Sequence, residues 1–377
     1  MTRELQEKLE SYQRVWAEVD LDAIWENMVH MKENIAEKTK ILAVIKTDGY
    51  GHGGVPIAKM LEQLDFMFGY AAATYEEAHV LREAGVKKPI LILGYTFPYC
   101  YEELIREEIR PAVYRRDTVE ELVAAAAKVG QKAKVHIKVD TGMGRIGITP
   151  DEEGLEFVRF LIEHPELEVE GIFTHFATAD EADDSKFKRQ LAFFTNLVEN
   201  LADRPRLVHA SNSATSIWHA ETVFNAVRLG VVIYGLNPSG SALNLPYKIR
   251  PALSLETALV HVKTLPAGQD VGYGATYTTT TDEVIGTIPI GYADGWTRDL
   301  QGFHVIVDGQ FCPIVGRVSM DQITVRLPKV YPLGTPVTLM GENGGASITA
   351  TEVAEKRGTI NYEVLCLLSD RVPRSYE

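Results

Sequence analysis

The chain has 377 residues, 45% of them hydrophobic and 24% charged, with a formal net charge of −14. Because single hydrophobic cores stop growing near ~250–300 residues, this length predicts two domains, and the composition excludes a disordered chain. The negative charge, with no run of clustered Lys and Arg, argues against nucleic acid or an anionic membrane surface as a partner.

The first residues, MTRELQEKLESYQ, are charged and lack the apolar core of a secretory signal. No window approaches the ~18 apolar residues of a transmembrane helix, so we expect a cytoplasmic protein. The cysteines Cys100, Cys312 and Cys366 are widely spaced, without metal-ligand spacing, and we expect them to be small buried apolar residues.

Up to about residue 245, short β-rich runs alternate with amphipathic stretches such as 22–39 and 118–130, which is typical of a parallel sheet with crossover helices. The candidate strands lie at residues 15–21, 41–46, 66–72, 89–93, 111–114, 134–139, 169–175, 206–210 and 224–230. We therefore predict an α/β fold in which residues 14–245 form a (β/α)8 TIM barrel, with an open doubly wound sheet as the alternative. Neither GxGxxG nor GxxxxGK[ST] is present, which weakens that alternative.

After a Pro-, Gly- and Ser-containing boundary at about 237–251, mostly short strands separated by turn residues follow. We predict a C-terminal β-rich domain of residues 246–377, joined by residues 1–13. Within it, VDGQ predicts a tight hairpin, because Asp308 and Gly309 accept the positive φ angles of a two-residue turn.

Polar residues recur where barrel strands are expected to end, which is the face that carries the active site of barrel enzymes. They are Lys46, Asp140, Arg145, His175, Asn212, Ser213 and Arg228. The set contains neither a carboxylate pair for glycoside hydrolysis nor a cluster of metal ligands. Taken alone, a strand-end lysine is also explained as a solvated charge, and a barrel histidine as a structural group.

Together these residues suit an aldehyde cofactor that bears a phosphate. A lysine at the end of an apolar strand is partly desolvated, which lowers its pKa and favours covalent attachment to an aldehyde. Glycine-rich turns, SNSAT and RLGVVIYG, offer backbone N–H groups to a phosphate. An arginine near the ring nitrogen of pyridoxal phosphate would tune the cofactor's electronics.

Nine motifs, in order, resemble those of the alanine racemase family of fold type III pyridoxal-phosphate enzymes, and the resemblance runs from about Trp16 to Arg374. They are AVIKTDGYGHG, VDTGMGRIG, THFATAD, SNSAT, VRLGVVIYG, VGYGATY, IPIGYADGW, GRVSMDQ and TINYEV. The resemblance implies interconversion of L- and D-alanine by two catalytic bases on opposite faces of the substrate.

The resemblance also implies a role for each matching residue. Lys46 would hold the cofactor and act as one base, and Tyr273 would act as the other base in the active site of a partner subunit. His175 would support Tyr273, with Arg228 behind it and facing the pyridine nitrogen. The cofactor-binding set would be completed by Tyr50, Arg145, Asn212, Ser213, Gly230, Val231 and Tyr362.

Arg145 would also contact the substrate, together with Met320 and Tyr292, and the tyrosines near the substrate would leave room for little more than a methyl group. Lys138 matches a lysine that many relatives carry as a carbamate, an anion that would pair with Arg145. The implied protein is a cytoplasmic homodimer with shared active sites. It would supply D-alanine for peptidoglycan precursors or serve alanine catabolism, and the sequence leaves that choice open.

This sequence departs from the family at Thr47, Asp48 and Gly49, where KTDGYGHG replaces the commoner KANAYGHG. A serine or broad-specificity racemase of the same fold is therefore the main alternative, since an apolar pocket rejects an added hydroxyl poorly. An amino-acid decarboxylase and a noncatalytic cofactor-binding barrel are further alternatives. The first would carry a glutamate rather than Arg228 at the ring nitrogen, and the second would lack Tyr273.

Overall fold

The structure, a computed structural model, describes residues 14–377. Two compact units make up this part of the chain, residues 24–250 and residues 14–23 together with 251–377. No helix in residues 14–377 is long and apolar enough to span a membrane. Cys100 and Cys312 are buried as expected, whereas Cys366 is only half-buried.

Residues 24–250 contain a closed barrel of eight parallel strands, which confirms the (β/α)8 prediction over the open sheet. Its strands are β2 (Lys40–Val44), β3 (Met67–Ala72), β4 (Ile90–Ile92), β5 (Ile109–Val113), β6 (Ala133–Lys138), β7 (Leu167–Phe173), β8 (Leu207–His209) and β9 (Ala226–Leu229). The ring closes where β2 pairs with β9, Leu42 opposite Arg228.

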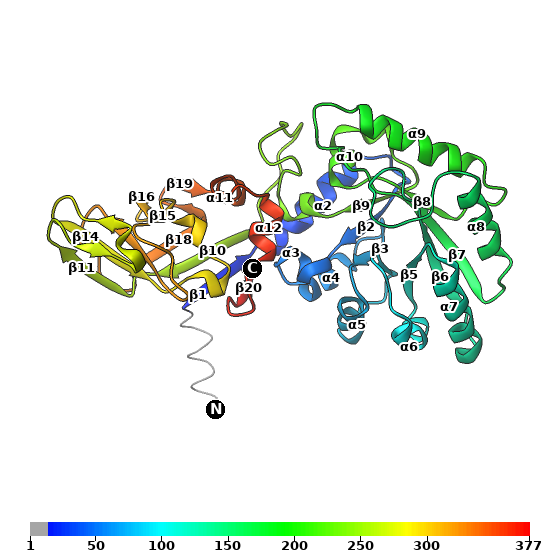
Figure 1. Ribbon diagram of the computed structural model, residues 1–377, viewed down its shortest axis with the longest axis horizontal. Coiled ribbons are helices and arrows are strands. Elements are labelled where there is room, and N and C mark those ends of the chain that lie inside the picture. Colours follow the sequence, from blue (N-terminus) through cyan, green and yellow to red (C-terminus); the bar gives the residue numbers. More distant parts are fainter. Residues whose placement is uncertain (1–13) are drawn as a thin grey trace. The chain divides into compact units, whose positions relative to one another are not determined.

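Helices lie on the outer side of the barrel strands (Figure 1). They are α2 (Leu21–Glu33), α3 (Lys46–Tyr50), α4 (Gly54–Leu61), α5 (Tyr75–Glu83), α6 (Tyr101–Arg106), α7 (Arg116–Val129), α8 (Glu152–Ile162), α9 (Ser185–Glu199) and α10 (Ser213–Trp218). In α8, Asp151 caps the first turn by accepting the Gly154 N–H at 3.3 Å, and Phe157, Val158 and Leu161 are buried. This single apolar face is what packs a helix against strands that are apolar on both sides.

The second unit is rich in strands, as predicted. A seven-stranded sheet has the order β16-β15-β18-β10-β1-β20 with β19 paired to β18, beside a three-stranded sheet β11-β14-β17 and a two-stranded sheet β12-β13. The strands are β1 (Val15–Val19), β10 (Leu253–Ala258), β11 (His261–Leu265), β12 (Asp270–Val271), β13 (Tyr277–Thr278), β14 (Glu283–Ile288), β15 (His304–Val307), β16 (Gln310–Pro313), β17 (Ile323–Leu327), β18 (Pro336–Asn343), β19 (Ala346–Ile348) and β20 (Arg374–Tyr376). Two helices follow β19, α11 (Ala350–Arg357) and α12 (Asn361–Cys366).

The assignment of residues 14–23 to the barrel is wrong. β1 pairs antiparallel with β10, Val19 opposite Leu253, and parallel with β20, so it belongs to the seven-stranded sheet. Its side chains alternate between buried and half-buried, which fits a sheet with one core face, whereas four of the five residues of β2 are buried. At the other boundary, residues 246–250 belong to the barrel unit. The prediction for residues 1–13 lies outside the described residues.

The predicted hairpin is confirmed. β15 and β16 pair with Val307 opposite Gln310, which leaves a loop of Asp308 and Gly309 with φ angles of 52° and 72°. Positive φ at both central residues is the geometry that matches the right-handed twist of the flanking strands.

Candidate active site

Lys46 lies where β2 ends, at the first position of α3, and it is followed by an unusual turn. Thr47, Asp48, Gly49 and Tyr50 all have left-handed backbone angles, with φ of 54°, 48°, 62° and 55°. The residues that depart from the family motif are therefore those that form this turn. Asp and Gly enter the left-handed region more readily than most residues, so two of the three suit their positions.

The carboxylate of Asp48 closes the same turn. Its Oδ1 accepts the Gly54 N–H at 2.7 Å, and its backbone carbonyl accepts the Gly53 N–H at 2.8 Å. The Asp48 side chain thus orders the start of α4. His52, which the sequence left without a role, is fully buried, with its ring 4.6 Å from that of Tyr234 and its Nδ1 3.0 Å from the Tyr50 carbonyl oxygen.

Tyr50, Ser213 and Gly230 meet at the ends of β2, β8 and β9. The Ser213 hydroxyl accepts the Gly230 N–H at 3.0 Å, and a Cβ placed on Gly230 would lie 2.6 Å from the Tyr50 hydroxyl oxygen. Val231 then begins the short 3-10 helix η3 (Val231–Tyr234). Two hydroxyls beside a position that admits no side chain, next to a helix start, form a cradle whose donors suit a phosphate.

Asn212 has a structural task beside this cradle. Its Oδ1 accepts the backbone N–H of Thr215 at 2.9 Å and the Thr215 hydroxyl at 3.1 Å, so it caps α10.

Arg228 is buried in the barrel and donates to groups from two neighbouring strand ends. One terminal nitrogen donates to His209 Nδ1 at 2.8 Å and the His209 carbonyl at 2.9 Å. The other donates to the Thr174 carbonyl at 2.8 Å and lies 3.3 Å from His175 Nδ1. Burial, and then the charge of Arg145, lowers the Arg228 pKa to about 9, so the guanidinium is still charged at neutral pH.

A chain of buried polar groups continues from Arg228 across the barrel interior. His209 Nε2 lies 2.9 Å from His136 Nδ1, and His136 Nε2 lies 3.2 Å from the Glu170 carboxylate. Because Arg228 only donates, His209 accepts at Nδ1 and donates at Nε2, and His136 does the same toward Glu170. Both imidazoles are therefore neutral, consistent with burial lowering the pKa of each.

Glu170 ends this chain as an anion. Its carboxylate also accepts from Arg110 Nε at 3.1 Å and from an Arg206 terminal nitrogen at 2.9 Å. Burial would raise its pKa, but His136 and Arg110 outweigh that effect and lower it to about 2. Two neutral histidines thus connect a buried cation to a buried anion.

His175 lies near four basic side chains at the carboxyl end of the barrel. Burial, and then the positive charges of Arg228, Arg145, Lys138 and Lys46, hold the pKa of His175 well below its ordinary value. Lys46, Lys138, Arg145, His175 and Arg228 come from the ends of four strands, β2, β6, β7 and β9, and the basic side chains act on one histidine. A site lined by these basic side chains suits an anionic cofactor and an anionic substrate.

Lys138 and Arg145 flank the loop that follows β6. Four backbone N–H groups, from Gly142 to Arg145, donate to the Asp140 carboxylate at 2.9 to 3.1 Å and fix this loop. Lys138 is buried and donates to the Val139 carbonyl at 2.7 Å. Burial first, and then Arg228, lowers the Lys138 pKa to about 7.

Four predicted residues lie in the strand-rich unit. Tyr273, in the 3-10 helix η4 (Tyr273–Ala275), is 70% exposed, Met320 is 53% exposed and Tyr292 is 42% exposed. Tyr362 is half-buried on α12. Tyr292 and Met320 are neighbours, because the Tyr292 N–H donates to the Ser319 carbonyl at 3.1 Å and the Ala293 N–H to the Met320 carbonyl at 3.0 Å.

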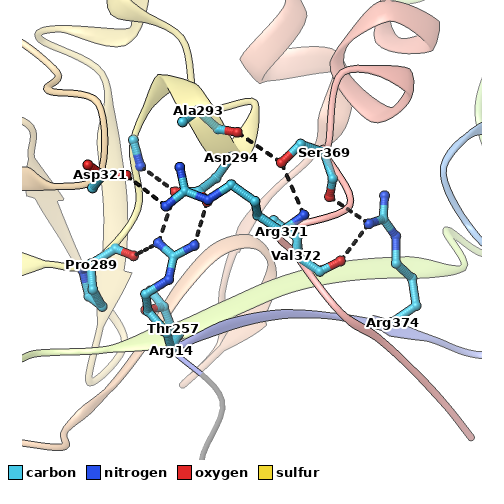
Figure 2. A network of polar contacts seen from close by, with 11 residues as sticks. Arg14, Thr257, Pro289, Ala293, Asp294, Asp321, Ser369, Arg371, Val372 and Arg374 are labelled. Carbon is cyan, nitrogen blue, oxygen red and sulfur yellow. Dashed lines mark hydrogen bonds and ion pairs between the residues drawn. The ribbon is translucent and has the colours of Figure 1, made fainter.

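A polar network anchors the loop that bears Tyr292 (Figure 2). Asp294, fully buried at the end of the 3-10 helix η5 (Tyr292–Asp294), accepts from Arg14 at 2.9 Å and from the Gly291 N–H at 3.0 Å, and pairs with Arg371 at 3.4 Å. Arg371 also donates to Asp321 at 2.7 Å. The network therefore links the loop of Tyr292 to the residue that follows Met320.

Sequence reasoning missed His136, His209, Glu170 and Asp294. The first three each stand between apolar residues inside a candidate strand, and that alternation was the available signal. In residues 14–377, no three His, Cys, Asp or Glu side chains gather as metal ligands.

A closed parallel barrel with a lysine at the end of its first strand, a phosphate cradle and a buried arginine, followed by a strand-rich unit, defines the class of fold type III pyridoxal-phosphate enzymes. Family models for the alanine racemase N-terminal and C-terminal domains match residues 19–238 and 252–376. The chain belongs to the alanine racemase family, whose members depend on pyridoxal 5′-phosphate.

An alanine racemase of Streptococcus thermophilus is 68% identical over 96% of this chain and 97% of its own length. The crystal structure of alanine racemase from E. faecalis has 47% identity and a TM-score of 0.93, covering 97% of this chain and 98% of that chain. A histidine racemase from Leuconostoc mesenteroides has 30% identity and a TM-score of 0.91, over 97% and 98%. The fold alone thus does not select the substrate.

Proposed function

We propose that this protein interconverts L- and D-alanine with pyridoxal 5′-phosphate, as a homodimer in the cytoplasm. The observation that carries the proposal is Lys46 at the end of β2, the meeting of Ser213 with Gly230, and Arg228 with a terminal nitrogen 3.3 Å from His175 Nδ1. The high identity to alanine racemases supports alanine as the substrate.

The residues of the barrel fit the cofactor. Tyr50, Ser213, Gly230 and Val231 would hold its phosphate, with Asn212 ordering that turn and Tyr362 adding a further hydroxyl. Lys46 would bind its aldehyde carbon, and Arg228 would face its ring nitrogen. The bound cofactor stabilises negative charge at the substrate Cα, which makes that carbon acidic.

Lys46 and Tyr273 of the partner subunit would move the two protons. Racemisation requires Cα–H to be removed on one face and returned on the other, so two groups on opposite faces suffice. Arg228 donates toward His175 Nδ1, which leaves the Nε2–H of His175 as a donor that can hold the phenolic oxygen of Tyr273. Tyr273 is 70% exposed on its own chain, so its side chain is accessible to the active site of another subunit.

Arg145 would hold the substrate carboxylate, and a carbamate on Lys138 would hold Arg145. The lowered pKa of Lys138, about 7, leaves much of the amine neutral at pH 7–8, and only a neutral amine combines with carbon dioxide. We expect the intact protein at pH 8 in bicarbonate to be heavier by one carbon dioxide, and to lose it on acidification. In carbon-13 bicarbonate at the same pH, the native protein should show a carbamate carbon signal by NMR that is absent in a Lys138→Arg variant, and absence of that signal in the unsubstituted protein would rule out the carbamate.

Tyr292, Met320 and Tyr362 would limit the substrate side chain to a methyl group. A serine or broad-specificity racemase is the second candidate, because the alanine and histidine racemases named above share this fold. The role of the product, in peptidoglycan precursors or in catabolism, follows from where the alanine is consumed rather than from the site.

The test is incubation of the purified protein and pyridoxal 5′-phosphate with L-alanine in deuterated water. We expect D-alanine and deuterium at Cα to appear together, and the same assay with L-serine and L-histidine to give slower exchange. Exchange without D-isomer would exclude racemisation, and faster exchange with serine would favour the second candidate.

A further inference from the structure

The turn after Lys46 needs an external support. Four consecutive residues, Thr47 to Tyr50, have φ between 48° and 62°. A left-handed backbone conformation is unfavourable for every non-glycine residue, and the β-branched Thr47 is among the least suited to it. Such a conformation persists only where the surroundings fix it.

Glu77 supplies a bond at the first residue of this turn. Its Oε1 accepts the Thr47 N–H at 2.7 Å, and its Oε2 accepts the Ala73 N–H at 2.7 Å. Ala73 directly follows β3, which pairs with β2 through Val44 and Ala71. One carboxylate therefore ties together the carboxyl ends of two adjacent barrel strands, one residue beyond Lys46.

The direction of this carboxylate is not the usual one for its position. Glu77 is the third residue of α5, whose N-cap Thr74 accepts the Glu77 N–H at 3.4 Å. A glutamate at this position commonly folds back onto the N-cap N–H in a capping box. Here both oxygens instead accept from N–H groups outside α5. The side chain therefore holds the residues that follow β2 and β3 rather than the first turn of its own helix.

The far end of the turn has its own support. Asp48 accepts the N–H groups of Gly53 and Gly54, at 2.8 and 2.7 Å. Asp48 thus fixes the end of the turn, where it joins α4. Glu77 fixes the start of the turn at Thr47, the residue that follows Lys46.

We propose that Glu77 is a positioning residue for Lys46: it holds Thr47 in the left-handed conformation and so sets the direction in which the lysine side chain leaves the end of β2. The inference rests on the proposed function, in which Lys46 binds the cofactor. Glu77 acts through the backbone and touches neither substrate nor cofactor.

The test compares Glu77→Gln with the matched control Glu76→Gln in the full-length protein. Glu76 lies on the same helical turn but accepts from the Tyr99 hydroxyl instead. Glutamine keeps one acceptor oxygen and sets an amide NH2 against the other N–H. We expect the dissociation constant of pyridoxal 5′-phosphate to rise about tenfold in Glu77→Gln and less than about twofold in Glu76→Gln. The pH at which the absorbance of the bound cofactor changes should also shift in Glu77→Gln only.

A rescue variant separates positioning from general stability. Glycine adopts left-handed backbone without steric cost, so Thr47→Gly in the Glu77→Gln background should recover most of the lost cofactor affinity. The inference is overturned if Glu77→Gln lowers only the melting temperature, with cofactor affinity and absorbance unchanged. It is equally overturned if Thr47→Gly restores none of the affinity.

Borohydride reduction of the wild-type protein with pyridoxal 5′-phosphate, followed by peptide mapping, keeps the two proposals apart. Cofactor fixed to a residue other than Lys46 contradicts the proposed function and removes the basis of this inference. Cofactor fixed to Lys46, with a Glu77→Gln variant that binds it normally, overturns the role of Glu77 alone.

Discussion

The barrel and the strand-rich unit hold their candidate residues in opposite ways. In the barrel, Arg228, His209, His136 and Glu170 are buried side chains whose hydrogen bonds run in one direction from cation to anion. In the strand-rich unit, Tyr273, Tyr292 and Met320 are exposed. There the buried group is Asp294, which anchors the backbone behind Tyr292 (Figure 2).

The two units thus differ in how they set the chemical state of their candidate residues. Buried groups in the barrel have their protonation states and tautomers fixed by the chain itself. The exposed tyrosines have no such constraint from their own chain, so their chemistry depends on what they meet. The predictions below test this contrast, from the largest expected effect to the smallest.

The largest effect should come from removing one base from each unit. Lys46→Ala and Tyr273→Phe should each lower kcat by about 10²–10⁴-fold, because each removes a proton carrier. Mixing the two variants under conditions that exchange subunits should restore about a quarter of wild-type activity, since a mixed dimer contains one intact site. Racemisation assays before and after mixing measure this, and no recovery would mean that Tyr273 serves its own chain.

Glu170→Ala should be the most destabilising change in the buried chain. It leaves the buried Arg110 without its carboxylate, which typically costs about 3–5 kcal/mol in the free energy of unfolding. Urea denaturation of the full-length protein provides the measurement. Glu108→Gln, which alters the more exposed pair with Lys134, is the control, with an expected loss of at most about 1 kcal/mol.

The buried histidines should make stability depend on pH. Burial lowers the pKa of His136 and His209, so below the ordinary histidine value of about 6.5 the unfolded chain binds protons that the folded chain does not. Their contribution is therefore complete above that pH and declines as the pH falls, by up to about 2.7 kcal/mol per pH unit for two histidines.

Glu170 extends the same trend to lower pH. Its pKa is lowered to about 2, so its contribution is complete above about pH 4.3 and is lost as the pH falls through about 2. Urea unfolding between pH 7 and 5 measures this trend against the opposing contribution of Glu256, whose pKa burial raises to about 7. The slope should decrease in a His136→Leu/His209→Leu variant, which retains only the contribution of His175. An unchanged slope in that variant would assign the pH dependence to other groups.

Asp294→Asn should have the smallest effect on stability, about 1–2 kcal/mol, because its partners Arg14 and Arg371 are partly exposed and can return to water. Asn still accepts the Gly291 N–H, so the loop keeps one anchor. We expect KM for alanine to rise with little change in kcat, since Tyr292 and Met320 are displaced while both bases remain. A fall in kcat at constant KM would contradict this role.

The barrel and its rim could be predicted because both depend on short-range patterns. Apolar runs followed by single polar residues give the strand ends, and in a closed parallel barrel those ends meet. This is why Lys46, Arg145, His175 and Arg228, which lie far apart in the sequence, lie in one electrostatic cluster in the structure.

What could not be predicted depends on longer-range or conformational facts. β1 has the composition of a barrel strand, and only its pairing with β10 and β20 shows its place. The intrinsic backbone preference of threonine does not predict the left-handed turn at Thr47, because a carboxylate 30 residues away holds it. His136 and His209 needed the barrel closure before their rings could be placed in contact.

Gly171 is a position where substitution would disturb the hydrogen-bonded pair His136 and His209. A Cβ on this residue of β7 would lie 2.5 Å from His136 Nδ1, the atom that receives the bond from His209. A single methyl group there would push the His136 imidazole aside. The displacement would pass through His209 to Arg228. Natural variation at this position should accordingly be restricted to glycine, although residue 171 itself contributes no functional group to the reaction.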